Sequence, residues 1–136
     1  ALLDAIGKTI HKMGNTQKYA SDDERAEKVM FVIITDGMEN ASSEYSYKKI
    51  KKMIDRQKEK YDWEFIFLGA NIDAVETASR FGIAEDRAAN YHADGEGTML
   101  NYEVISETVS MVRAKRSIDG SWKDKIDKDY KNRERQ

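Results

Sequence analysis

The chain contains neither cysteine nor proline among its 136 residues. Without cysteine it can form no disulfide framework and no thiolate metal site, and it is compatible with a reducing compartment. No apolar run approaches the roughly 20 residues that a membrane-spanning helix requires. There is also no signal-like segment near Ala1, although this absence means little because Ala1 is not an initiator methionine. We expect a cytoplasmic protein that does not enter the membrane.

The chain also lacks a large net charge of either sign. The chain has 23 basic and 25 acidic residues, which leaves a net charge of −2 and gives no global attraction to nucleic acid or anionic membranes. Basic residues gather toward the C-terminal end, but acidic residues are interspersed among them. This mixture is more typical of a solvated helix than of a nucleic-acid surface, so nucleic acid is not the expected partner.

The most informative stretch is the run of six apolar residues at 29–34, which continues into Thr35, Asp36 and Gly37. An unbroken, β-branched run of this length predicts a parallel strand covered on both faces. The one carboxylate of this stretch, Asp36, would then lie at the carboxyl end of a strand, which is where ligands bind in open α/β sheets. The alternative reading of Asp36 is an ordinary turn or capping aspartate.

Apolar periodicity and capping residues predict the other elements. Helical spacing predicts an N-terminal helix that ends near Gly14. Asp73 begins a capping box, Gly82 ends the helix that follows it, and Thr98 is the expected N-cap of a later helix. The predicted helices occupy residues 1–13, 43–60, 74–81 and 99–116, and the predicted strands occupy residues 29–35, 63–68 and 88–92.

This alternation of helices and strands predicts an α/β fold, a Rossmann-like doubly wound parallel sheet with right-handed crossovers. Three strands are few, since sheets average about five or six. We therefore expect the fold to be truncated on its N-terminal side. Residues 1–116 would form a partial α/β domain, and residues 117–136 a charged C-terminal helix or tail, whose apolar residues recur every four positions.

Three segments carry a resemblance to a known family. Residues 32–42 read Val-Ile-Ile-Thr-Asp-Gly-Met-Glu-Asn-Ala-Ser and resemble the fourth-strand segment of a von Willebrand factor A (VWA) domain of the bacterial and phage type. Residues 1–7 resemble the start of the helix before that strand, and residues 65–71 resemble the next strand and its loop. The resemblance covers residues 1–115 and applies to the C-terminal part of such a domain.

The resemblance implies a binding module with a metal-ion-dependent adhesion site. In the family, oxygen ligands from three loops hold Mg²⁺ or Mn²⁺, and a protein partner's carboxylate completes the shell. Only the third-loop aspartate carries over, onto Asp36. The family's Asp-x-Ser-x-Ser loop has no counterpart here, because the similar segment at 119–123 lacks the second serine. We therefore expect a protein-binding function, an incomplete cation site with Asp36 as its metal ligand, and no enzyme activity.

Two other function classes stay open at this point. The first is a Rossmann-like hydrolase or transferase that uses Asp36 as nucleophile or metal ligand. The second is a scaffold that binds nucleic acid through its basic end. His11 and His92 lack ligand spacing, and Asp94 with Glu96 fits a solvated turn better than an acid–base pair.

The strand at 29–35 also has a predicted position in the sheet. The resemblance implies that it pairs with the strand at 63–68 on one side and is left as an open edge on the other. We expect near-complete burial of Phe31, Ile33, Phe65 and Phe67. We also expect the open edge to pair with a second copy of the chain, with a strand from another chain, or with residues 117–136.

Overall fold

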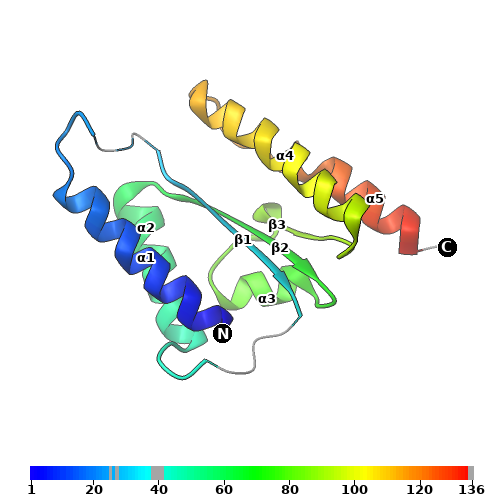
Figure 1. Ribbon diagram of the computed structural model, residues 1–136, viewed down its shortest axis with the longest axis horizontal. Helices are drawn as coiled ribbons and strands as arrows, with labels where there is room; N and C mark the ends of the chain where they lie inside the picture. The colour runs from blue at the N-terminus through cyan, green and yellow to red at the C-terminus, as the bar shows by residue number, and fades with distance from the viewer. Residues whose placement is uncertain (25, 27, 38–41, 135–136) are drawn as a thin grey trace.

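The computed structural model describes residues 1–24, 26, 28–37 and 42–134. Figure 1 shows a small parallel sheet with helices packed around it. The elements in chain order are α1 (Leu2–Tyr19), β1 (Met30–Asp36), α2 (Tyr47–Tyr61), β2 (Glu64–Ala70), α3 (Ala74–Arg80), the 3₁₀ turn η1 (Glu85–Arg87), β3 (Ala88–Asn90), α4 (Gly95–Arg113), the 3₁₀ turn η2 (Gly120–Lys123) and α5 (Asp124–Glu134). Among the described helices, none is long and apolar enough to cross a bilayer.

The sheet has the order β1-β2-β3, and both pairings are parallel. The prediction that residues 29–35 and 63–68 form adjacent parallel strands is confirmed, since Ile33 lies opposite Phe67 in the β1–β2 register. The α/β class and the parallel open sheet are confirmed with it. The register places the carboxyl ends of all three strands at one edge of the sheet, which is where the candidate site lies.

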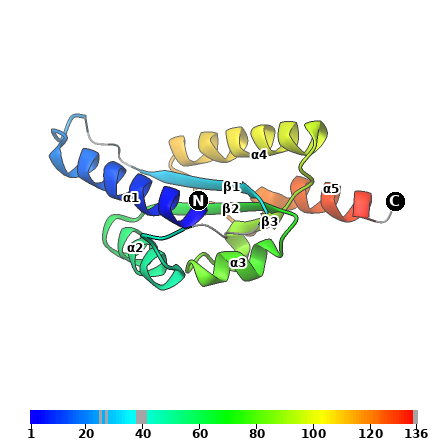
Figure 2. The same ribbon diagram turned by 60° about the horizontal axis from the view of Figure 1, so that its bottom comes forward.

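Helices lie on both faces of the sheet (Figure 2), and a hydrophobic core fills the space on each face. Phe65 and Phe67 of β2 point into the first core, together with the apolar faces of α1, α2 and α3. Ile66 and Leu68 point into the second core, together with residues of α4, η2 and α5. Every residue of β2 from 65 to 70 is buried, which explains why this strand reads as a continuous apolar run rather than an alternating one.

The strand β1 is covered less completely than the sequence predicts. Ile33 is 4% exposed, but Phe31 is only half-buried, so its predicted near-complete burial is wrong. Ile34 is 52% exposed. The physical reason is position, because β1 is an edge strand that pairs only with β2 among the described residues. Phe65 and Phe67, on the central strand, are buried as predicted.

Helix boundaries follow capping chemistry, with three corrections. The prediction that Asp73 caps α3 is confirmed, since its carboxylate accepts a hydrogen bond from the Glu76 N–H at 3.1 Å. The helix α1 continues through Gly14 to Tyr19. The helix α2 starts four residues later than predicted, after its N-cap Ser46. Asp94, not Thr98, caps α4 and accepts from the Gly97 N–H at 2.8 Å.

Residues 117–134 pack on the second face of the sheet. Ile118, Trp122 and Ile126 are all buried in the second core, and α5 lies beside α4 in both views (Figures 1 and 2). The segment is therefore not a strand along β1, and the version of the edge-pairing prediction that used residues 117–136 is wrong. The four-residue apolar spacing does not mark a single helix, because Ile118 precedes η2, Trp122 lies in η2 and only Ile126 lies in α5, which contacts α4 and β3.

The two glycines in the first turn of α4 give a matched pair of substitutions. A Cβ at Gly97 would lie 1.9 Å from the carbonyl oxygen of His92, whereas a Cβ at Gly95 would meet nothing within 4 Å. We expect Gly97→Ala to lower the free energy of unfolding by about 1–3 kcal/mol, because the His92 backbone must move. Gly95→Ala should raise that free energy by up to about 1 kcal/mol through helix propensity. Urea unfolding followed by circular dichroism measures both, and equal effects would contradict the packing argument.

Candidate functional site

The end of β1 holds Asp36 at the carboxyl edge of the sheet. Asp36 lies opposite Ala70, the last residue of β2, and its side chain is exposed. The next residue, Gly37, has φ +106° and donates its N–H to the Ala70 carbonyl at 3.0 Å. A left-handed φ favours glycine, so Gly37 lets the chain turn away at once while Asp36 stays at the end of the strand.

Asn71 follows β2 directly and contacts Asp36. Its Nδ2 donates a hydrogen bond to Asp36 Oδ1. Asn71 adopts a left-handed φ of 59°, which asparagine tolerates better than most residues. Sequence reasoning included Asn71 only as part of a resembling segment. A signal was available, because Gly-Ala-Asn after a buried strand places a polar amide at the same edge as Asp36.

Tyr91 comes after β3 and completes a row across the three strand ends. It is 8% exposed, and its hydroxyl donates to the Thr35 carbonyl oxygen at 3.5 Å. Burial raises the pKa of the Tyr91 phenol, and the charge of Asp36 raises that pKa further. Sequence reasoning missed Tyr91, because 55 residues separate it from Asp36 and only the strand order brings the two together.

The donor set at this edge does not by itself fit a complete Mg²⁺ shell. Mg²⁺ requires about six near-octahedral oxygen ligands, and one oxygen of Asp36 is already engaged by Asn71. Within the described residues, no group of three or more His, Cys, Asp or Glu side chains could hold a metal ion. The predicted resembling segment includes Glu39 and Asn40, which lie outside the described residues.

The other polar candidates have structural roles. The ring of His92 stacks on Tyr130 with centroids 4.8 Å apart, and His11 lies 3.3 Å from the Asn15 amide. Asp94 caps α4, and Arg133 beside it lowers the pKa of the Asp94 carboxyl. Asp94 and Glu96 both form ion pairs with Arg133, which ties α5 to the start of α4.

The Asp-x-Ser look-alike is also structural, since the Asp119 carboxylate accepts the Ser121 N–H at 2.9 Å and caps η2. The structure therefore brings Asp36 together with Asn71 and Tyr91, whereas His92 contacts Tyr130 and His11 contacts Asn15. Comparison with known proteins adds no assignment: no protein-family model, no curated protein and no solved structure matches the chain.

Proposed function

We propose that the chain is a protein-binding module of the VWA type, which engages its partner at the carboxyl edge of β1 through a divalent cation. The observation that carries the proposal is the placement of Asp36, an exposed carboxylate at the end of a parallel strand and beside Asn71 of the next strand. Carboxyl ends of parallel strands are the usual ligand position in open α/β sheets.

In this proposal Asp36 supplies one oxygen ligand, and a carboxylate of the partner supplies another. Mg²⁺ or Mn²⁺ suits such a site because both favour oxygen donors. Other residues of the chain orient the Asp36 carboxylate. The Asn71 amide fixes the Asp36 carboxylate from one side, and the Gly37 N–H holds the turn against β2. The cation, when bound, supplies the positive charge that attracts an acidic partner.

The described residues alone should bind the cation weakly. We expect dissociation constants for Mg²⁺ and Mn²⁺ of about 1 mM or weaker, because one carboxylate leaves most of the coordination shell to water. Titration calorimetry checks this expectation. A micromolar site that Asp36→Ala removes would contradict it, and would mean that further residues of the chain complete the shell.

The location of the weak site tests the proposal more directly. Mn²⁺ broadens nearby amide signals in nuclear magnetic resonance spectra, and we expect broadening confined to the residues around Gly37 and Asn71. Asp36→Asn should abolish it, while the matched variant Asp62→Asn should not. Asp62 is also an exposed carboxylate, with a side chain 89% exposed, but it is ion-paired with Lys28.

Acetate serves as a probe for the partner's carboxylate. If a partner carboxylate completes the shell, acetate should strengthen the Mn²⁺ broadening at Asp36 in a concentration-dependent way. Broadening that is absent at Gly37, or unchanged in Asp36→Asn, would overturn the cation-mediated proposal. Detectable hydrolase or transferase turnover lost in Asp36→Asn would instead favour the enzyme alternative.

A further inference from the structure

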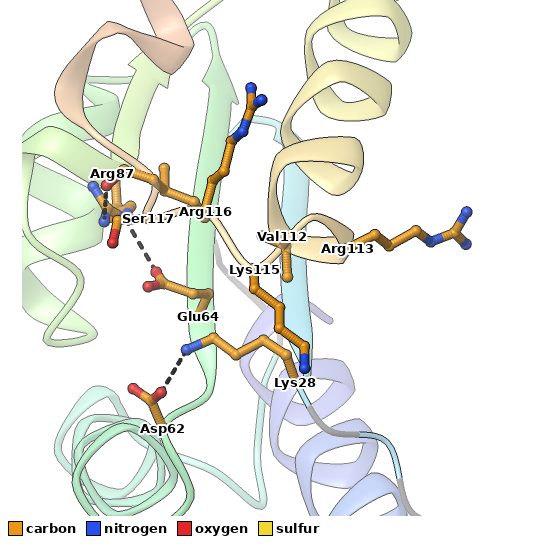
Figure 3. A pocket seen from close by; sticks show the side chains of 10 residues that line it. Lys28, Asp62, Glu64, Arg87, Val112, Arg113, Lys115, Arg116 and Ser117 are labelled. Atoms are coloured by element: carbon orange, nitrogen blue, oxygen red, sulfur yellow. Dashed lines mark hydrogen bonds and ion pairs between the residues drawn. The ribbon is translucent and has the colours of Figure 1, made fainter.

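A concave surface lies at the opposite end of the sheet from Asp36. A pocket of about 760 Å³ opens between the amino ends of β1 and β2 and the C-terminal end of α4 (Figure 3). Its size falls within the roughly 300–1,000 Å³ of small-molecule sites. We call it the amino-end pocket; its lining includes Lys28, Glu64, Arg87, Val112, Arg113 and Arg116.

The acidic residues of the amino-end pocket are already neutralised. Asp62 Oδ2 lies 2.7 Å from Lys28 Nζ, and Glu64 Oε2 lies 3.1 Å from Arg87 Nε. Arg87 is further fixed by a 2.7 Å hydrogen bond from its Nη2 to the Ile118 carbonyl oxygen. These two ion pairs, drawn as dashed lines in Figure 3, leave this part of the pocket nearly neutral.

Arg113 and Arg116 add positive charge that the acidic residues of the amino-end pocket do not offset, because those residues are already ion-paired. Both are exposed, and neither forms a side-chain hydrogen bond or ion pair with another described residue. In Figure 3 their side chains extend from the rim in different directions. Two separated guanidinium groups at a rim favour an extended anion over a compact one, because each can bind a different oxygen group.

The end of α4 does not repel an anion strongly. A helix C-terminus carries partial negative charge on its last carbonyl groups. Here the carbonyls of Ser110, Met111 and Val112 accept hydrogen bonds from the N–H groups of residues 114–116 at 2.9–3.0 Å. These bonds satisfy the three carbonyls, so the cationic side chains of Arg113, Lys115 and Arg116 determine the charge at the rim. Val112 and Ile118 add an apolar wall for the uncharged part of a ligand.

The geometry points to the amino-end pocket as a binding site for a small organic phosphate, with the phosphate chain across Arg113 and Arg116 and an apolar or planar group against Val112 and Ile118. This inference is independent of the cation site, because it uses the other end of the sheet. Guanidinium groups bind phosphate oxygens through paired hydrogen bonds, which explains why arginine suits this role better than lysine.

Calorimetric titration of the whole chain with adenosine triphosphate tests the inference. Arg113→Gln/Arg116→Gln should weaken the dissociation constant at least tenfold. The matched variant Lys48→Gln/Lys52→Gln removes the same charge from exposed positions on α2 and should change it less than twofold. Arg113→Lys/Arg116→Lys keeps the charge and should lie between the two.

Further probes separate the chemistry of the ligand. Inorganic triphosphate should bind more weakly than adenosine triphosphate, and adenosine alone should not bind measurably. The inference is overturned if the wild-type chain does not bind adenosine triphosphate at millimolar concentration, or if both double variants lose affinity equally. Tighter binding of a single-stranded oligonucleotide, with a salt dependence set by its phosphate count, would overturn it in favour of a nucleic-acid surface.

Discussion

Trp122→Ala is expected to lower the free energy of unfolding by about 3–5 kcal/mol, the usual cost of removing a buried aromatic side chain. Trp122 is 6% exposed and lies in the second core beside residues of β2 and α5. Its indole Nε1 donates to the Asp86 carbonyl oxygen at 2.6 Å. Since single domains are stable by about 5–15 kcal/mol, this loss would remove a large share of the total.

Two controls separate packing from the hydrogen bond. Trp122→Phe keeps a ring in the core but leaves the Asp86 carbonyl without its donor, and should cost about 1–3 kcal/mol. Tyr102→Ala removes an aromatic side chain that is 74% exposed and should change stability by less than about 0.5 kcal/mol. Urea unfolding measures all three. Unchanged stability in Trp122→Ala, with fast amide exchange throughout α5, would show that the C-terminal segment is not part of the folded core.

The sheet could be predicted from the sequence because its strands are short, apolar and followed by turn residues. The run at 29–34 and the run at 65–68 are too short and too rich in β-branched and aromatic residues for buried helices, and the structure pairs them in parallel. Asp73 could be predicted as a cap because capping depends on residues three positions apart. Strands and helix caps of this kind can be predicted from a single sequence, because they depend on residues close together in the chain.

Burial along β1 could not be predicted from the run alone. Ile33 and Ile34 are neighbours of similar hydrophobicity, yet one is 4% exposed and the other 52% exposed. The difference depends on which helices cover each face at the edge of the sheet, and that is set by tertiary packing. An apolar run identifies a strand but does not say how far each face is covered.

Only part of the candidate site could be predicted, because its other members are brought together by the tertiary fold. Asp36 is visible in the sequence because it ends a strand, but its neighbours Asn71 and Tyr91 come from the ends of two other strands. Strand order, not sequence distance, brings these three side chains to one edge.

The N-cap of α4 was misassigned because Thr98 has suitable chemistry, whereas Gly97 lets the turn form earlier, close to the His92 carbonyl.

The largest expected effect on the state of the chain in solution concerns the open edge of β1. From Met30 to Thr35 this strand has no proline and no charged side chain, so it lacks the usual protection against edge pairing. Its outer N–H and C=O groups face no other strand among the described residues. Each such group costs about 1–3 kcal/mol when it is buried without a partner.

We therefore expect the purified chain to associate through β1, with a dimer population that falls on dilution. Light scattering across a dilution series measures it. Ile34→Lys places a charge on the edge strand at a side chain that is 52% exposed, and should weaken association at least tenfold. The control Tyr61→Lys changes a side chain that is 51% exposed, on α2, and should leave association unchanged. A folded monomer at all concentrations, with fast exchange of the outward-facing β1 amides, would show that water alone satisfies this edge.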